Sequence, residues 1–95
     1  MNVLIVEDEP LAAERLIGLL KKTGEHFMLQ GVLESVEETV ASFSSGRKID
    51  LLFLDIELAD GKSFEIFNRV TVEAPIIFTT AYDQYALQAF KHFSI

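Results

Sequence analysis

The sequence predicts a single α/β domain built on a doubly wound parallel sheet. Four short apolar runs, of a length typical of strands buried on both faces of a sheet, alternate with stretches whose apolar residues recur at helical spacing. Strands that alternate with helices imply parallel pairing and right-handed crossovers. Three of the apolar runs end in carboxylate or hydroxyl side chains, which a parallel sheet would bring to one edge.

The first strand and the first helix are expected at the N-terminus. Val3–Val6 is an apolar run that ends in the acidic sequence Glu7-Asp8-Glu9. Pro10 suits the first turn of a helix, where its missing N–H needs no partner, and we expect that helix over Leu11–Lys22. Its apolar face is predicted to hold Ala12, Leu16, Leu19 and Leu20, widened by Ala13 and Ile17.

An edge strand and a capped helix are expected next. Phe27–Leu33 is predicted to be a strand, and Gln30 and Gly31 weaken it enough that we place it at an edge of the sheet. Ser35 and Glu38 fit a capping box that begins the following helix. The apolar face of that helix is formed by Val36, Val40 and Phe43.

A third strand and a third helix follow. Ile49–Leu54 is an apolar run that stops at Asp55, and Asp60-Gly61 gives a turn signal. Lys62–Val70 is predicted to be a helix whose apolar face holds Phe64, Phe67 and Val70 and is broadened by Ile66, with both phenylalanines in the core.

The last strand and helix are expected after Pro75. Ile76–Phe78 is the fourth apolar run, and Thr79-Thr80 follows it directly. Asp83 is placed to cap a final helix. The apolar face of that helix would be formed by Tyr85, Ala86, Ala89, Phe90 and Phe93.

Composition excludes several classes of protein. The net charge of −7 argues against direct binding of nucleic acid or of an anionic membrane, and favours cations or a basic partner surface. The chain has no cysteine, so disulfides are excluded and a cytosolic setting is compatible. No apolar run approaches the ~20 residues of a membrane-spanning helix.

Acidic and hydroxyl groups are predicted to gather at one edge of the sheet. Glu7 and Asp8 follow the first strand, Asp55 follows the third, and Thr80 lies just after the fourth. Clustered carboxylates repel one another unless a cation joins them, and their hard oxygen atoms suit Mg²⁺. Acidic groups, a metal and a hydroxyl donor favour phosphoryl transfer, with Asp55 as the nucleophile.

Other polar residues are interpreted as structural. We expect Glu9, Asp60 and Asp83 to cap nearby turns or helices. Thr79 is also interpreted as structural, because Thr80, the last residue before the apparent turn, is the better candidate for a phosphoryl contact.

Three motifs together resemble the receiver domains of bacterial two-component response regulators. They are VLIVEDEP, LLFLDIELADG and IIFTTAYD, and the resemblance covers the whole chain. The segment TAYDQYALQAF resembles the LytTR (LytR/AlgR) class, whose regulators join a receiver to a DNA-binding domain. This resemblance implies a flavodoxin-like fold with strand order 2-1-3-4, in a cytoplasmic bacterial protein.

The resemblance also implies a role for each matching residue. Asp55 would accept a phosphoryl group from a histidine kinase, and Thr80 would contact that group and move on activation. Asp8 would bind Mg²⁺ directly, and Glu7 would bind it directly or through water. The main-chain carbonyl of Glu57 would complete the protein ligands.

Receivers of this kind continue into a fifth strand, a lysine-proline step and a fifth helix, none of which we find within residues 1–95. We therefore interpret the chain as a receiver that is incomplete at its C-terminus, with its output domain absent; Lys62 is only a distant substitute for the lysine. Loss of the outer strand would leave Ile76–Phe78 at an edge, and loss of the fifth helix would expose Ala13 and Ile17. We therefore expect self-association.

Two other functions are compatible with the same residues. The first is an Mg²⁺-dependent phosphatase with an aspartate nucleophile, which usually needs a second aspartate two residues later, where this chain has Glu57. The second is an interaction or dimerisation module that works without phosphorylation.

Overall fold

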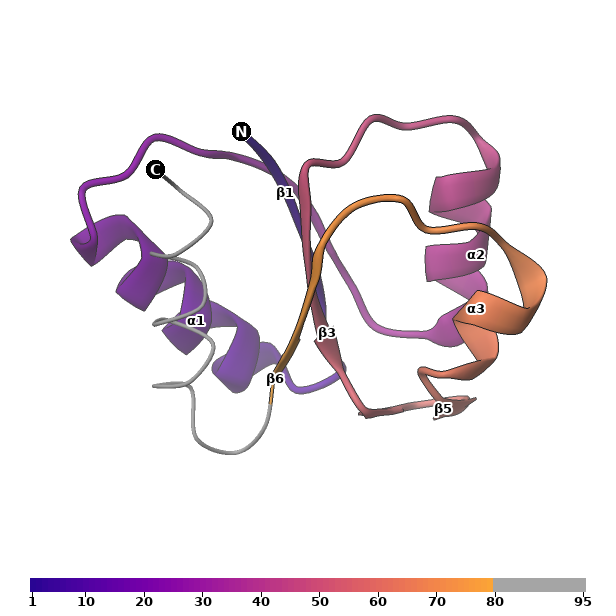
Figure 1. The fold of residues 1–95 in the computed structure, drawn as a ribbon. Helices are drawn as coiled ribbons and strands as arrows, with labels where there is room; N and C mark the ends of the chain where they lie inside the picture. The colour runs from indigo at the N-terminus through magenta and orange to yellow at the C-terminus, as the bar shows by residue number, and fades with distance from the viewer. Residues whose placement is uncertain (80–95) are drawn as a thin grey trace.

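The computed structural model describes residues 1–79, which form an α/β domain with one central parallel sheet (Figure 1). Its strands are β1 (Asn2–Val6), β2 (Met28–Leu33), β3 (Leu51–Asp55) and β6 (Ile76–Thr79). They are hydrogen-bonded in the order β2-β1-β3-β6. The predicted order 2-1-3-4 is confirmed, because β6 is the fourth strand of this sheet along the chain, and β2 lies at an edge as expected.

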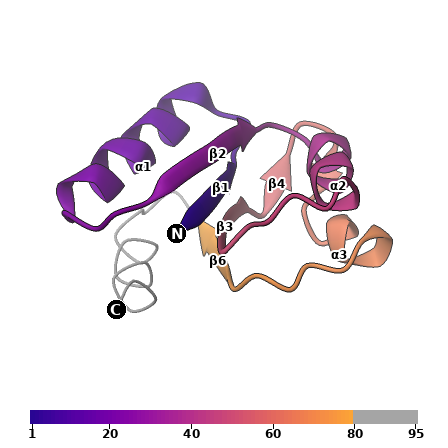
Figure 2. The ribbon, with the colours of Figure 1, turned by 90° about the horizontal axis from the view of Figure 1, so that it is seen from above.

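Helices cover both faces of the sheet (Figure 2). Helix α1 (Pro10–Lys22) packs on one face, and α2 (Val36–Ser44) and the short α3 (Glu65–Arg69) lie on the other. Side chains alternate along β1, so that Val3 and Ile5 join the core beneath α1 whereas Leu4 and Val6 join the core beneath α2 and α3. This two-sided burial explains why the central strands are continuously apolar.

The central strand β3 is the most deeply buried part of the sheet. Leu51, Leu52, Phe53 and Leu54 are all fully buried, and Asp55 at the end of the strand is partly exposed. The carboxyl end of the strand therefore presents one polar side chain at the rim of an apolar layer, as the sequence predicts.

The buried face of α1 differs in detail from the prediction. Ala13, Leu16 and Leu20 are buried, and Ile17 packs partly against the same core. The expectation that Ala13 would be exposed is therefore wrong. Leu16 and Leu20 are buried as predicted, and Ala13, which was expected to widen the apolar face, lies on the same side of the helix.

The segment after Asp55 contains an unpredicted antiparallel hairpin. Its strands are β4 (Glu57–Leu58) and β5 (Gly61–Lys62), in which Glu57 pairs with Lys62 and Leu58 with Gly61. The expected helix over Lys62–Val70 is therefore too long at its start, and α3 begins only at Glu65. Gly61 has a φ of 141°, a conformation that suits glycine and ends any helical continuation through the turn.

The apolar face of α3 also differs from the prediction. Ile66 is fully buried and Val70 packs against the core, whereas Phe64 is 51% exposed and Phe67 37% exposed. Ile66 and Val70, both expected on the apolar face, form the side of this short helix that meets α2 and the sheet. Placing Phe64 and Phe67 in the core was wrong, because both stay partly exposed. Phe64 instead contacts the ring of Phe78 edge to face, with ring centres 5.7 Å apart.

Several predictions concern residues outside the described range. They are Thr80, the Asp83 cap and the final helix. Within residues 1–79, no helix is long and apolar enough to cross a membrane. β6 pairs with β3 alone among the described strands, and self-association through β6 stays a prediction.

Candidate functional site

Three carboxylates meet at the carboxyl ends of the two central strands. Glu7 and Asp8 directly follow β1, and Asp55 is the last residue of β3. The register pairs Val6 with Leu54, so the residues that follow each of them are neighbours at the same edge. One carboxylate oxygen from each of Glu7, Asp8 and Asp55 lies within 4.8 Å of the others, and all three residues are half-buried. The predicted juxtaposition of these three acidic groups is thus present.

Backbone hydrogen bonds fix the two strand ends that carry the cluster. The Glu7 N–H donates to the carbonyl oxygen of Leu33 at 2.8 Å, which continues the β1–β2 pairing by one residue. The Glu9 N–H donates to Oε2 of Glu7 at 3.1 Å, and the Ile56 N–H donates to Oδ1 of Asp55 at 2.8 Å. Each of these two bonds orients one carboxylate of the cluster through one of its oxygens.

The pKa of Glu7 shows how the three carboxylates affect one another. Burial is the largest cause that raises the pKa of Glu7 to about 7, and the nearby charge of Asp55 and hydrogen bonds with Asp55 and Asp8 raise it further. The Glu9 N–H opposes this rise only in part. A carboxylate that resists ionisation beside two others indicates that a bound positive charge would stabilise the site.

The spacing of the carboxylates fits a small divalent cation. Oxygens bound to one Mg²⁺ at about 2.1 Å lie at most about 4.2 Å apart, and the three carboxylate oxygens here all lie within 4.8 Å of one another. The hard oxygen donors also match the chemistry of Mg²⁺.

Glu57 has a different environment from the other predicted ligands. Its exposed side chain forms an ion pair with Lys62 across the β4–β5 hairpin, and this pairing lowers the pKa of Glu57. The carboxylate is therefore no member of the cluster, which agrees with the proposed use of its main-chain carbonyl instead. That use stays a prediction, and Lys62 has Glu57 as its partner.

The fourth strand delivers a threonine to the same edge. Thr79 is buried and pairs with Asp55 in the β3–β6 register. Its burial agrees with the structural role expected for it. Thr80 lies outside the described residues, so its contact with a phosphoryl group stays a prediction.

The expected capping groups have mixed outcomes. Glu9 occupies the N-cap position of α1, but its side chain makes no capping hydrogen bond, so the prediction that it caps a helix was wrong. Pro10 lacks an N–H, so the first turn of α1 has one donor fewer to be capped. Ser35 caps α2 as predicted, accepting from the Glu38 N–H at 3.1 Å. Asp60 does cap a helix, but that helix is α2, more than twenty residues earlier in the chain.

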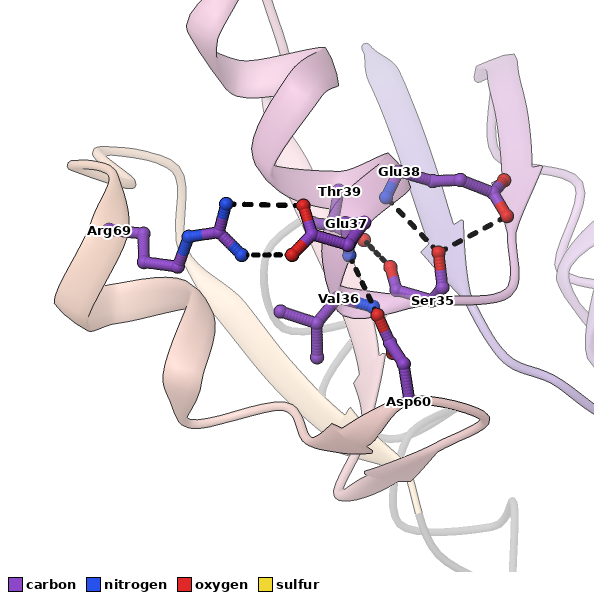
Figure 3. A network of polar contacts seen from close by, with 7 residues as sticks. All are labelled: Ser35, Val36, Glu37, Glu38, Thr39, Asp60 and Arg69. Atoms are coloured by element: carbon purple, nitrogen blue, oxygen red, sulfur yellow. Dashed lines mark hydrogen bonds and ion pairs between the residues drawn. The ribbon is translucent and has the colours of Figure 1, made fainter.

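An ion pair between α2 and α3 was not predicted. Both guanidinium NH₂ groups of Arg69 donate to the carboxylate of Glu37 (Figure 3). The two residues are 32 positions apart, and each lies on the exposed side of its own helix. Neither position carries a local sequence signal that could identify the partner.

Comparison with known proteins identifies relatives across nearly the whole chain. The family described as the response regulator receiver domain matches residues 3–92. The sensory transduction protein LytT of Enterococcus faecalis is 46% identical over 96 residues, which cover 96% of this chain and 38% of that protein. The transcriptional regulatory protein LytR of Staphylococcus aureus is 40% identical over 94 residues, covering 96% and 37%. The chain thus spans little more than a third of these relatives.

Solved structures agree with this comparison. The MaeR response regulator bound to beryllium trifluoride superposes with a TM-score of 0.73 at 27% identity, covering 98% of this chain and 77% of that one. The response regulatory domain of mrkE from Klebsiella pneumoniae gives a TM-score of 0.69 at 31% identity, covering 96% and 75%.

Proposed function

Because the chain belongs to the response regulator receiver domain family, we propose that it is a phosphoacceptor signalling domain that receives a phosphoryl group on Asp55. The observation that carries this proposal is the meeting of Glu7, Asp8 and Asp55 within 4.8 Å at the carboxyl ends of β1 and β3. Such a cluster is costly unless a cation joins it.

In the proposed reaction Asp55 is the nucleophile. A carboxylate oxygen of Asp55 attacks the phosphorus atom of a phosphohistidine on a histidine kinase. A P–O bond forms while the P–N bond breaks, and the electron pair of the broken bond stays on the imidazole nitrogen. The Ile56 N–H, which donates to Oδ1 of Asp55, leaves Oδ2 as the attacking atom.

The neighbouring carboxylates would hold Mg²⁺. Asp8 and Asp55 would bind it directly, Glu7 directly or through water, and the Glu57 carbonyl would complete the protein ligands. Bound Mg²⁺ would neutralise the charge on the transferring phosphoryl group. Thr80 would donate its hydroxyl proton to a phosphoryl oxygen and couple phosphorylation to a change of conformation.

The wider role that we propose is signal relay to transcription. The relatives named LytT and LytR support a sensory or regulatory role, and one of them is called a transcriptional regulator. We propose that the phosphorylated receiver controls an output domain, of the LytTR DNA-binding type, and that the receiver itself does not touch nucleic acid.

The test is phosphorylation by a small-molecule donor. The protein is mixed with Mg²⁺ and acetyl phosphate and its intact mass is measured, with Asp55→Asn as the loss variant. Glu9→Gln is the matched control, because Glu9 is an exposed acid beside the cluster that makes no capping bond. We expect one acid-labile phosphoryl group on the wild type and on Glu9→Gln, and none on Asp55→Asn.

The same experiment separates the alternatives. A phosphatase would release phosphate from many esters with turnover. An interaction module that works without phosphorylation would gain no mass, and Mg²⁺ would leave its melting temperature unchanged. Either result would refute the phosphoacceptor function.

A further inference from the structure

Asp60 connects the hairpin after Asp55 to the start of α2. It lies in the turn between β4 and β5, five residues beyond Asp55. Its Oδ1 accepts the Val36 N–H at 2.7 Å and its Oδ2 accepts the Glu37 N–H at 3.1 Å (Figure 3). The Asp60 side chain therefore connects the hairpin to two residues of α2, Val36 and Glu37, which lie 24 and 23 positions earlier in the sequence.

The bonds from Asp60 supplement the cap that α2 already has. Ser35 accepts the Glu38 N–H and donates its own hydroxyl to the Glu38 carboxylate at 3.2 Å. The Val36 and Glu37 N–H groups have no partner within the first helical turn, and Asp60 takes both. These N–H groups, that of Val36 foremost, lower the pKa of Asp60, so the carboxylate remains charged at neutral pH.

The base of the hairpin is also held. The Ser63 N–H donates to the Ile56 carbonyl oxygen at 2.8 Å, which closes the loop directly after Asp55. Leu58 is buried in the same apolar cluster as Val36 and Ile66. The segment from Ile56 to Asp60 is thus fixed at its base by a backbone bond, in its middle by Leu58 and at its tip by Asp60.

This arrangement constrains the residues that adjoin the phosphoacceptor. Ile56 donates the hydrogen bond that orients the Asp55 carboxylate, and Glu57 carries the main-chain carbonyl proposed as a metal ligand. Both residues lie between the end of β3 and the hairpin. Movement of the hairpin away from α2 would displace them together.

We infer that Asp60 is a positioning residue for the phosphoacceptor site, which it serves by fixing the β4–β5 hairpin to the first turn of α2. Asp60 itself touches neither the acidic cluster nor a substrate. It acts through the hairpin on Ile56 and Glu57, so that their backbone groups are in place before Mg²⁺ binds. This inference rests on the proposed phosphoacceptor function.

The test compares Asp60→Asn with Ser35→Ala. Asparagine keeps the size of the side chain but has one acceptor oxygen, and its NH₂ group would face an N–H donor. Ser35→Ala removes a cap from the same helix and leaves the hairpin untouched. Mg²⁺ affinity is measured by isothermal titration calorimetry on the full chain, at a temperature at which circular dichroism shows each variant to be folded.

The two variants are expected to separate. Loss of a group that supports metal ligands typically costs at least tenfold in metal affinity, and we expect the Mg²⁺ dissociation constant of Asp60→Asn to rise about tenfold. Ser35→Ala should bind Mg²⁺ like the wild type. Amide hydrogen exchange at Ile56 and Ser63 gives a second readout, and it should be faster in Asp60→Asn and unchanged in Ser35→Ala.

The opposite results would overturn the inference. Wild-type Mg²⁺ affinity and wild-type exchange at Ile56 in Asp60→Asn would mean that Asp60 merely caps α2. Equal losses in both variants would mean that affinity follows the stability of the helix. Failure of the phosphoacceptor function itself looks different, because the wild type would then fail to bind Mg²⁺ or to take up a phosphoryl group.

Discussion

The acidic cluster and the first turn of α2 use the same type of side chain in opposite electrostatic settings. In the cluster, Glu7 faces Asp8 and Asp55, and its pKa is raised to about 7. At α2, Asp60 faces two backbone N–H groups and Glu37 faces Arg69, so both carboxylates have lowered pKa values. Carboxylates that face donors are satisfied within the protein, whereas carboxylates that face one another need a cation.

This difference distinguishes the residues of a candidate binding site from the residues that hold its surroundings in place. The carboxylates of the cluster repel one another, and the cluster lies at the edge of the sheet where ligands bind. The carboxylates at α2 already face hydrogen-bond donors, and their contacts connect α2 to the hairpin that follows Asp55 and to α3. A search for functional residues based on acidity alone would treat both groups as equivalent.

The largest effect is expected at Leu58, a buried apolar side chain of the hairpin. Leu58→Ala removes a buried side chain between the hairpin and α2, and it should lower the free energy of unfolding by about 2–5 kcal/mol. Since small domains have only about 5–15 kcal/mol in total, chemical denaturation should show a clear loss. Phe64→Ala is the control, because Phe64 is half exposed; an equal loss there would mean that Leu58 is no special anchor.

The second prediction is that the same type of substitution, aspartate to asparagine, changes the melting temperature in opposite directions in the two regions. In Mg²⁺-free buffer at pH 8, Asp55→Asn should raise the melting temperature, because it removes a charge beside Glu7 and keeps an oxygen for the Ile56 N–H. Asp60→Asn should lower it by several degrees, because one N–H at the start of α2 loses its acceptor. Thermal melts of the two variants would contradict the comparison if both moved in the same direction.

Much of the fold was predictable because it depends on local patterns. The run Leu51–Leu54 is apolar because both faces of β3 are covered, and Pro10 and Ser35 act on their own helices. The predicted meeting of Glu7, Asp8 and Asp55 followed from parallel topology alone. In these cases the physical cause lies within a few residues of the signal or in the direction of the strands.

The errors arose where distant partners decide the structure. The strands of the hairpin are two residues long, too short to show a periodic pattern, and pairing of Glu57 with Lys62 replaces the first turn of the expected helix. Four apolar residues were expected on one face of α3, and Ile66 and Val70 do pack against the core that α2 shares, whereas Phe64 and Phe67 stay partly exposed. The target of Asp60 lies in another helix, and no local pattern specifies it.

The third prediction uses pH to distinguish the two regions. The pKa of Glu7 is raised from 4.5 to about 7 in the folded protein, so the folded state binds more protons than the unfolded state between these values. Without Mg²⁺, the contribution of Glu7 to stability is therefore present below about pH 4.5 and is lost as pH rises to 7. The lowered pKa values of Asp60 and Glu37 act in the opposite direction and at lower pH.

Thermal melts between pH 5 and 8 would measure this effect. We expect the melting temperature to fall with rising pH in the presence of a chelator, and the stabilisation by Mg²⁺ to grow over the same range, because the cation favours ionised Glu7. Glu7→Gln should remove most of the slope. A slope unchanged in Glu7→Gln would assign the titration to another group.

The smallest expected effect is at the ion pair between α2 and α3. Arg69→Gln removes the charge that holds Glu37, but both side chains are largely exposed, where such pairs contribute little to stability. The melting temperature and the Mg²⁺ affinity should both stay close to those of the wild type, and added salt should erase any difference. A loss of Mg²⁺ affinity comparable to that of Asp60→Asn would show instead that α3 supports the phosphoacceptor loop as much as the hairpin does, because the hydrogen bonds of Arg69 go to Glu37 in the first turn of α2.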